Sequence, residues 1–377
     1  MSTASNITAS APTAPGRLSR ALVLLLVAAS VLAAALVAGP RYGLLLLIGL
    51  GFGLALEGFR FGFTGPWRRM ILQRDPSGLI AQLVCIGIVA IAAFPLLAAN
   101  PAELKGAHAP VGVAMIGGAF LFGAAMQVVL GCGSGTLVNA GSGNAVGAVA
   151  LPFFAIGSFA GAYHLSWWTS IGSLPMMTLS GANGLMVTLA GLAAFSGLAY
   201  LLRAKGAFKM PPRYVGAIVV LAGLAILHLV VAGQPWGVVY GLGLWVAKGV
   251  VAVGGDLSGS TFWAAPGNAA RVEASLLTDI TSLTDLGLIG GAALVAWWRA
   301  GLASPVGKLP ARAWLSVIVA GLVLGYSSRL AFGCNIGAFF SGIGTGSVHG
   351  WVWFIAAFTG SWAGIRLRPL LGLEARR

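Results

Sequence analysis

Two cysteines flanked by glycines stand at corresponding places in the two halves of the chain. Cys132 lies in segment 130–135 (LGCGSG), and Cys334 lies in segment 332–337 (FGCNIG). A shift of 202 residues superposes the cysteines and also aligns Gly123 with Gly325. A repeated, broken, glycine-rich segment in a hydrophobic chain is typical of the binding site of a transporter.

A cysteine in such a loop can offer a weak S–H donor and a polarisable sulfur acceptor. After each cysteine we expect a half-helix to begin, near Thr136 and Ala338. Its N-terminus would point free N–H groups and a partial positive charge at the centre, which predicts an anion site. The residues expected there are Gly131, Cys132, Gly133, Ser134, Gly135, Gly333, Cys334, Asn335 and Gly337.

Other polar residues near these loops allow more than one interpretation. A lone membrane cysteine usually acts as a small hydrophobe, which is the interpretation for Cys85. Arg329 precedes Cys334 by five residues, and an arginine at membrane depth is costly and typically functional or paired. We expect it to attract an anion or brace the loop. Asp285 could neutralise Arg329, which we favour, or relay protons; Asp279 lies six residues earlier.

The composition indicates a membrane protein. Of the 377 residues, 58% are hydrophobic and 8% are charged, whereas soluble domains have about 25% charged residues. The net charge of +14 is spread between apolar runs rather than on one basic face, which argues against nucleic acid and for loops retained in the cytoplasm. The four histidines are scattered and no metal or nucleotide motif appears, so we expect no cofactor and no metal.

The chain reads as a disordered segment, 1–16, followed by a single transmembrane transport domain, 17–377. Apolar runs long enough to cross a bilayer predict about nine spans. They cover 21–38, 78–97, 111–130, 145–165, 185–202, 214–232, 276–298, 313–330 and 348–365. The stretches 42–58 and 237–253 are ambiguous between spans and re-entrant hairpins.

Charge placement chooses between the two topologies. If both ambiguous stretches cross fully, the basic cluster at 299–312 falls opposite the cluster at 203–213. If both are hairpins, all four basic clusters share the cytoplasmic side, and we adopt this arrangement. It places the N-terminus outside and the C-terminus inside a bacterial inner membrane. The halves, about 42–165 and 237–366, are then inverted repeats whose cysteine hairpins enter from opposite sides.

The chain resembles the YeeE/YedE family of bacterial sulfur-compound transporters from about residue 42 to 366. The resemblance rests on residues 131–137 (GCGSGTL), on Gly143-Asn144, and on 329–337 (RLAFGCNIG) followed by 349–351 (HGW). It implies an all-α, hourglass-shaped membrane protein whose cysteines pass thiosulfate along through S–H···S hydrogen bonds. It also implies a small sulfur anion as substrate, contact with the lipid bilayer, and a cytoplasmic sulfur carrier of the TusA type as a partner.

The chain departs from the family pattern at one position. Gly62, in Arg60-Phe61-Gly62-Phe63, stands where the family commonly has a third cysteine. We therefore expect two thiols at the waist. The alternatives are a carrier or channel for another small solute, such as a selenium species, and a membrane thiol sensor or sulfur-transfer protein. The last is disfavoured because neither cysteine has an adjacent His or Lys to activate it.

Overall fold

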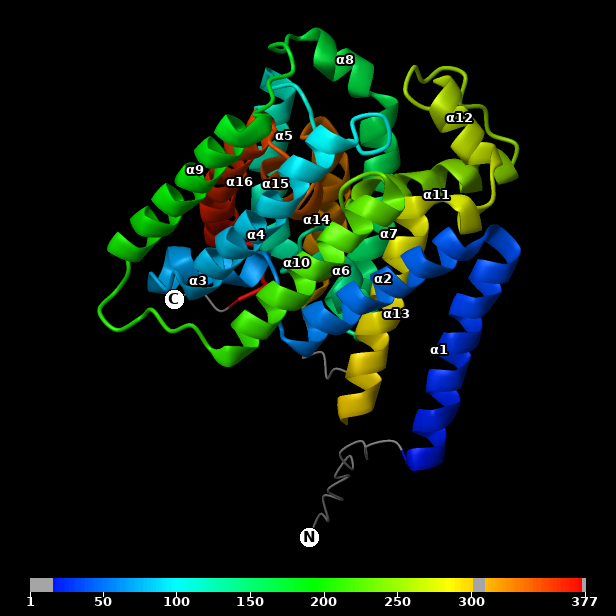
Figure 1. Ribbon diagram of the computed structural model, residues 1–377, viewed down its shortest axis with the longest axis horizontal. Helices are drawn as coiled ribbons and strands as arrows, with labels where there is room; N and C mark the ends of the chain where they lie inside the picture. The colour runs from blue at the N-terminus through cyan, green and yellow to red at the C-terminus, as the bar shows by residue number, and fades with distance from the viewer. Residues whose placement is uncertain (1–15, 301–308, 375–377) are drawn as a thin grey trace.

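The computed structural model describes residues 16–300 and 309–374. Regular structure in these ranges is helical, with only two isolated β-bridges, Gly112–Ser173 and Thr178–Ser347. The predicted all-α class is confirmed (Figure 1). The predicted disordered segment 1–16 lies, apart from Gly16, outside the described residues.

The longer helices account for most of the described chain. They are α1 (Arg17–Ala38), α2 (Pro40–Gly58), α4 (Ser77–Ala99), α5 (Val113–Val129), α7 (Ala145–Tyr163), α9 (Gly181–Leu201), α10 (Pro212–Ala232), α11 (Val239–Ala252), α13 (Ile280–Ala300), α14 (Ala311–Leu330) and α16 (Val348–Leu367). The shorter elements are α3 (Thr64–Gln73), α6 (Gly133–Gly141), α8 (Leu165–Ser170), α12 (Pro266–Glu273), η1 (Leu276–Thr278), η2 (Asn335–Phe340) and α15 (Ser341–Gly344). Within the described ranges, nine helices are long and apolar enough to cross a membrane.

The stretch 42–58 is one of these nine, which corrects its interpretation as a re-entrant hairpin. It forms α2, a single helix of 19 residues that begins with Pro40 and ends before Arg60, whose φ is 50°. Its glycines do not break the helix. Gly49 and Gly53 instead lie against the backbone of α13 at Thr284 and Leu288, so their missing side chains permit close packing.

The second ambiguous stretch is also a single helix. Helix α11 has 14 residues, fewer than the roughly 20 that a bilayer crossing needs. The predicted hairpins therefore become one long helix in the first half and one short helix in the second. The helix is interrupted in the loop 59–63, before α3, and not inside 42–58 as the sequence analysis expected.

The start of α1 and the end of α13 lie at the same end of the molecule, the lower end in Figure 1. The Arg20 guanidinium lies 4.5 Å from the centre of the Trp298 ring, beside Arg299. The sequence analysis had placed the N-terminus opposite the basic cluster at 299–312. Because α2 is a full-length helix rather than a hairpin, the start of α1 lies at the same end of the molecule as the end of α13.

Two helix pairs repeat the same backbone packing. Gly123 of α5 faces Ala357 of α16, and Gly360 of α16 faces Phe120. In the other pair, Gly325 of α14 faces Phe154 of α7, and Gly157 of α7 faces Leu322. Shifts of 202 or 203 residues convert one set of contacts into the other. The repeated glycines therefore allow two equivalent, close helix contacts.

A valine at Gly123 should destabilise the protein, because its side chain would overlap the Ala357 backbone. We expect a loss of about 1–3 kcal/mol, seen as a lower thermal unfolding midpoint in detergent. Gly117→Val on the same helix is the matched control, since a side chain there meets nothing within 4 Å. Equal midpoints for the two variants would contradict this packing role.

Candidate transport site

Each cysteine follows a helix that stops at a left-handed residue. Leu130, after α5, has φ 56°, and Phe332, after α14, has φ 54°. Side chains other than glycine rarely adopt this conformation, so it is retained only where the surroundings enforce it. The same backbone break therefore occurs at equivalent positions, two residues before Cys132 and two before Cys334.

Each thiol then lies at the start of the next helical segment. The Cys132 sulfur accepts the N–H of Gly135 at 3.4 Å, and the Cys334 sulfur accepts the N–H of Ile336 at 3.4 Å. These segments, α6 and η2, begin directly after the cysteines. The predicted starts near Thr136 and Ala338 were therefore three residues late, because the sulfur itself caps the first turn.

The two loops meet at a buried point. A side-chain carbon at Gly133 would lie 2.6 Å from the Cys334 sulfur, so the second thiol lies directly against the backbone of the first loop. The Cys132 and Cys334 side chains are 1% and 0% exposed. Glycine at position 133 is therefore what allows the loops from the two halves to touch.

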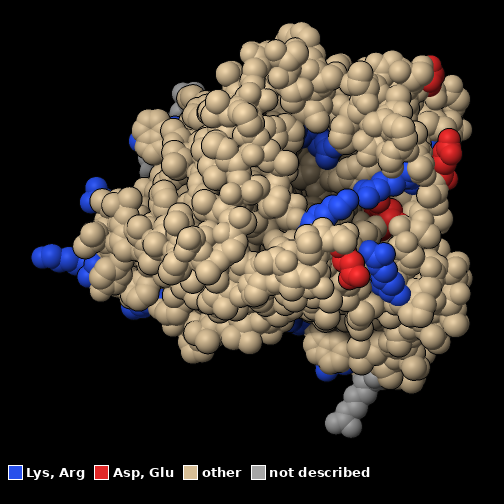
Figure 2. Space-filling model, turned by 45° about the horizontal axis from the view of Figure 1, so that its top comes forward, with Lys and Arg blue, Asp and Glu red and all other residues tan. Residues whose placement is uncertain are grey.

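A cavity adjoins each loop. The first cavity, of about 370 Å³, is lined by residues that include Glu57, Arg60, Gly62, Ser134 and Gly135. The second cavity, of about 380 Å³, is lined by residues that include Tyr240, Arg329, Gly333, Cys334 and Gly337. It also includes Leu165 at the start of α8. Figure 2 shows a hollow in the face that carries α8, with Lys and Arg side chains beside it.

Arg329 lies in the second cavity. Its guanidinium lies 4.7 Å from the centre of the Phe262 ring and 5.7 Å from that of Tyr240, and its Nε has no hydrogen-bond partner. Among the described residues it forms no ion pair with Asp285, whose two carboxyl oxygens also lack partners. The favoured pairing of these two residues is therefore not what the structure shows. Aromatic faces brace the cation instead.

Asn335 is a second polar group without a partner. Its side chain is 0% exposed, and neither amide atom forms a hydrogen bond within the described chain. Buried amides in folded proteins are almost always hydrogen-bonded. Asn335 directly follows Cys334 and corresponds in the repeat to Gly133. It can therefore present a donor and an acceptor to a small ligand at the loop.

The backbone of Gly62 is held beside the first cavity by a hydrogen bond from Gln82. Gln82 donates to the Gly62 carbonyl at 2.9 Å and accepts the indole N–H of Trp67 at 2.9 Å. A side-chain carbon at Gly62 would meet nothing within 4 Å. A cysteine side chain would therefore fit at position 62, beside the first cavity, where this chain has glycine.

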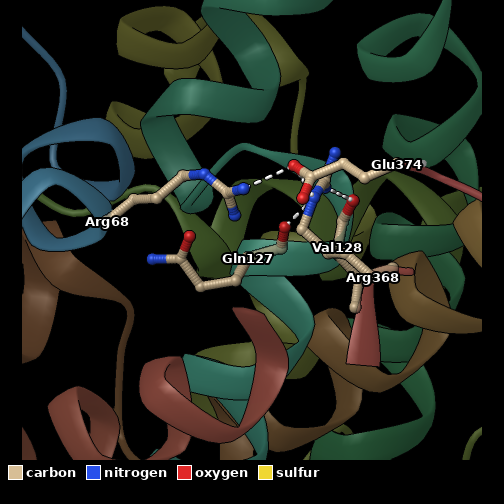
Figure 3. A network of polar contacts seen from close by, with 5 residues as sticks. All are labelled: Arg68, Gln127, Val128, Arg368 and Glu374. Carbon is tan, nitrogen blue, oxygen red and sulfur yellow. Dashed lines mark hydrogen bonds and ion pairs between the residues drawn. The ribbon is translucent and has the colours of Figure 1, made fainter. Parts of the chain in front are cut away.

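Sequence reasoning missed the polar network that supports the end of α5. Arg368 donates to the carbonyls of Gln127 and Val128 at 2.7 Å each, and Glu374 joins Arg368 to Arg68 of α3 (Figure 3). These carbonyls belong to the last turn before the Cys132 loop. The sequence suggested only basic clusters here, because pairing with Glu374 depends on the tertiary fold.

Cysteine introduced at Gly62 should be accommodated and should react with a small thiol reagent. The reason is that the position has free space and lines the first cavity. We expect labelling of Gly62→Cys to exceed that of the wild type, whose three thiols are all buried. Gly62→Ala, which adds no thiol, is the control. Equal labelling of the two variants in folded protein would show that this cavity is closed to solvent.

A family model and several known proteins match this chain. The family model described as sulphur transport matches residues 59–363. The probable transporter YedE of Escherichia coli (strain K12) is 37% identical over 100 residues, which are 26% of this chain and 25% of that protein. The YedE of Salmonella typhimurium is 34% identical over the same length. Both matches span only a quarter of those relatives.

A third relative matches over most of its length. The thiosulfate transporter TsuA of Spirochaeta thermophila is 26% identical over 347 residues, 84% of this chain and 96% of that protein. The family model alone covers well over half of the chain. The chain therefore belongs to the sulphur transport family, the YeeE/YedE family that its cysteine motifs predicted.

Proposed function

We propose that the chain takes up a small, thiosulfate-like sulfur anion across the bacterial inner membrane, with its C-terminus in the cytoplasm. The observation that carries the proposal is the buried contact between the Gly133 loop and Cys334, with a cavity beside each loop. The name of the TsuA relative supports thiosulfate as the anion. One cavity beside each of two touching loops also agrees with an hourglass shape.

The anion moves by successive binding rather than through an open pore. Both thiols are almost fully buried, so no water-filled path separates them. Each offers an S–H donor and a polarisable sulfur, which suits the terminal sulfur of thiosulfate. Cys334 receives the anion from the second cavity and Cys132 passes it toward the first. The thiols form no covalent bond with it, and the protein acts as a carrier rather than an enzyme.

Polar groups near the thiols bind the oxygen end of the anion. Arg329 supplies an unpaired positive charge in the second cavity, and Asn335 supplies an amide donor beside Cys334. Ser134 lies 3.5 Å from the Cys132 sulfur and lines the first cavity. The resemblance to the family adds a cytoplasmic sulfur carrier of the TusA type as the acceptor beyond this cavity.

A related soft anion, such as a selenium species, is the second candidate. The observation that favours it is Gly62, which leaves the first cavity without a third thiol and with space for a larger solute. Competition between thiosulfate and a selenium analogue in vesicle uptake would rank the two substrates.

Expression of the chain should restore growth of cells that lack sulfate and thiosulfate uptake when thiosulfate is the sole sulfur source. We expect Cys132→Ala and Cys334→Ala together to abolish this rescue, because both binding stations lose their thiols. Cys85→Ala is the control, since Cys85 is buried on α4 and its thiol donates only to the Ile218 carbonyl. Restored growth with the double variant, expressed at the normal level, would contradict the relay mechanism.

Replacing Arg329 by Gln should weaken substrate capture more than turnover. A hydrogen bond to a charged group is worth about 1.5–3 kcal/mol, so we expect KM for thiosulfate uptake to rise about 10–100-fold. Arg312→Gln, at the exposed far end of the same helix, should leave KM unchanged. A wild-type KM in the Arg329 variant would remove this residue from the anion path.

A further inference from the structure

Asp285 is the most deeply buried carboxyl group that the transport site does not yet use. It is 0% exposed on α13, and neither of its oxygens has a hydrogen-bond partner among the described residues. Gly241 of α11 leaves room for the Oδ2 atom of Asp285. A side-chain carbon at position 241 would lie only 2.8 Å from that oxygen. An ionised carboxylate in such a place would be an uncompensated charge, so the site accommodates the neutral, protonated form.

Asp285 is connected to the second cavity along one face of α13. Thr281, one turn earlier, lines that cavity together with Arg329 and Cys334. Asp279, at the start of α13, is 6% exposed and accepts the N–H of Ser282 at 2.7 Å. The carboxyl therefore lies beside the anion path.

The charged groups around Asp285 do not neutralise it. On α11, Lys248 donates to the Val272 carbonyl at 2.7 Å, and Tyr240 stacks with Arg271 and Arg329. On α10, His228 lies 3.2 Å from the Thr284 hydroxyl.

The other elements packed on α13 add no partner. Helix α6 contains no ionisable residue, and the ionisable residues of α2 (Arg41, Tyr42 and Glu57) lie near its two ends. Asp279, directly before α13, is the nearest like charge. Among the described residues, the surroundings therefore contain a second acid but no cation that pairs with Asp285.

We propose that Asp285 binds a proton that enters the cell together with the anion, an inference that rests on the proposed function. Import of an anion into a cell with a negative interior is uphill and needs a co-transported cation. Ionised Asp285 repels an anion at Cys334, whereas protonated Asp285 does not. Binding of the proton therefore favours binding of the anion, and binding of the anion favours binding of the proton. The proton comes from water in the second cavity to a carboxylate oxygen and leaves to water on the cytoplasmic side after the anion.

Vesicles containing the full chain and an internal pH dye test this coupling. With radiolabelled thiosulfate outside, the wild type should acidify the interior, and accumulation should rise about tenfold per pH unit of gradient if one proton enters per anion. Asp285→Asn, which mimics the neutral carboxyl, should exchange thiosulfate without proton entry and without gradient-driven accumulation.

The matched control is Asp256→Asn. Asp256 is exposed, and hydrogen bonds from Ser258 lower the pKa of its carboxyl below the ordinary value, so it stays ionised throughout the tested range. This variant should retain coupled uptake. Thiosulfate uptake by the wild type without proton entry, or gradient-driven accumulation by Asp285→Asn, would overturn the coupling. Complete lack of wild-type thiosulfate uptake would instead contradict the proposed function.

The proton site can also be tested by infrared spectroscopy without substrate, even if the wild type takes up no thiosulfate. Infrared spectra of the wild type in lipid at neutral pH should contain the carbonyl stretching band of a protonated carboxyl group. Subtraction of the Asp285→Asn spectrum should isolate that band, and the Asp256→Asn spectrum should retain it. Identical bands in the wild type and Asp285→Asn would show that Asp285 carries no proton.

Discussion

The structure depends on the constraint that a helix broken inside a membrane must be surrounded by protein, because lipid cannot satisfy its free N–H and C=O groups. Two helices break here, at Leu130 and at Phe332. Close glycine contacts hold α5 against α16 and α14 against α7, so the helices that lead into both breaks are packed against protein. The cysteine sulfurs then accept N–H groups where each chain resumes its helix. Each of the two thiols thus contributes both to the fold and to the proposed relay.

The two halves use equivalent positions differently. Gln127 corresponds to Arg329 in the repeat, and its amide donates to the Thr64 carbonyl at 3.3 Å, which ties α5 to α3. Arg329 instead lies over aromatic rings in the second cavity with Nε unpaired. At this repeat position, the second half therefore carries a charge where the first half carries a neutral amide.

Sequence reasoning succeeded where the cause was local. Composition predicted the helical membrane class, and the spacing of Cys132 and Cys334 predicted the two broken segments. It failed at 42–58, which was expected to be a re-entrant hairpin but is one helix whose Gly49 and Gly53 fit against α13. It also failed for Asp285 and Arg329, because spacing in a sequence does not reveal which side chains face each other across a bundle.

The sequence by itself determined the apolar spans, the positions of the two thiols and the small residues between helices, since each depends on residue type and near neighbours. Only the tertiary structure decided that Gly133 touches Cys334, that α2 is one full helix, and that Asp285 has no cation beside it. These facts depend on how distant segments pack. In a chain with glycines in most of its long helices, many pairings satisfy the same local pattern, and the close fit of particular backbones selects one.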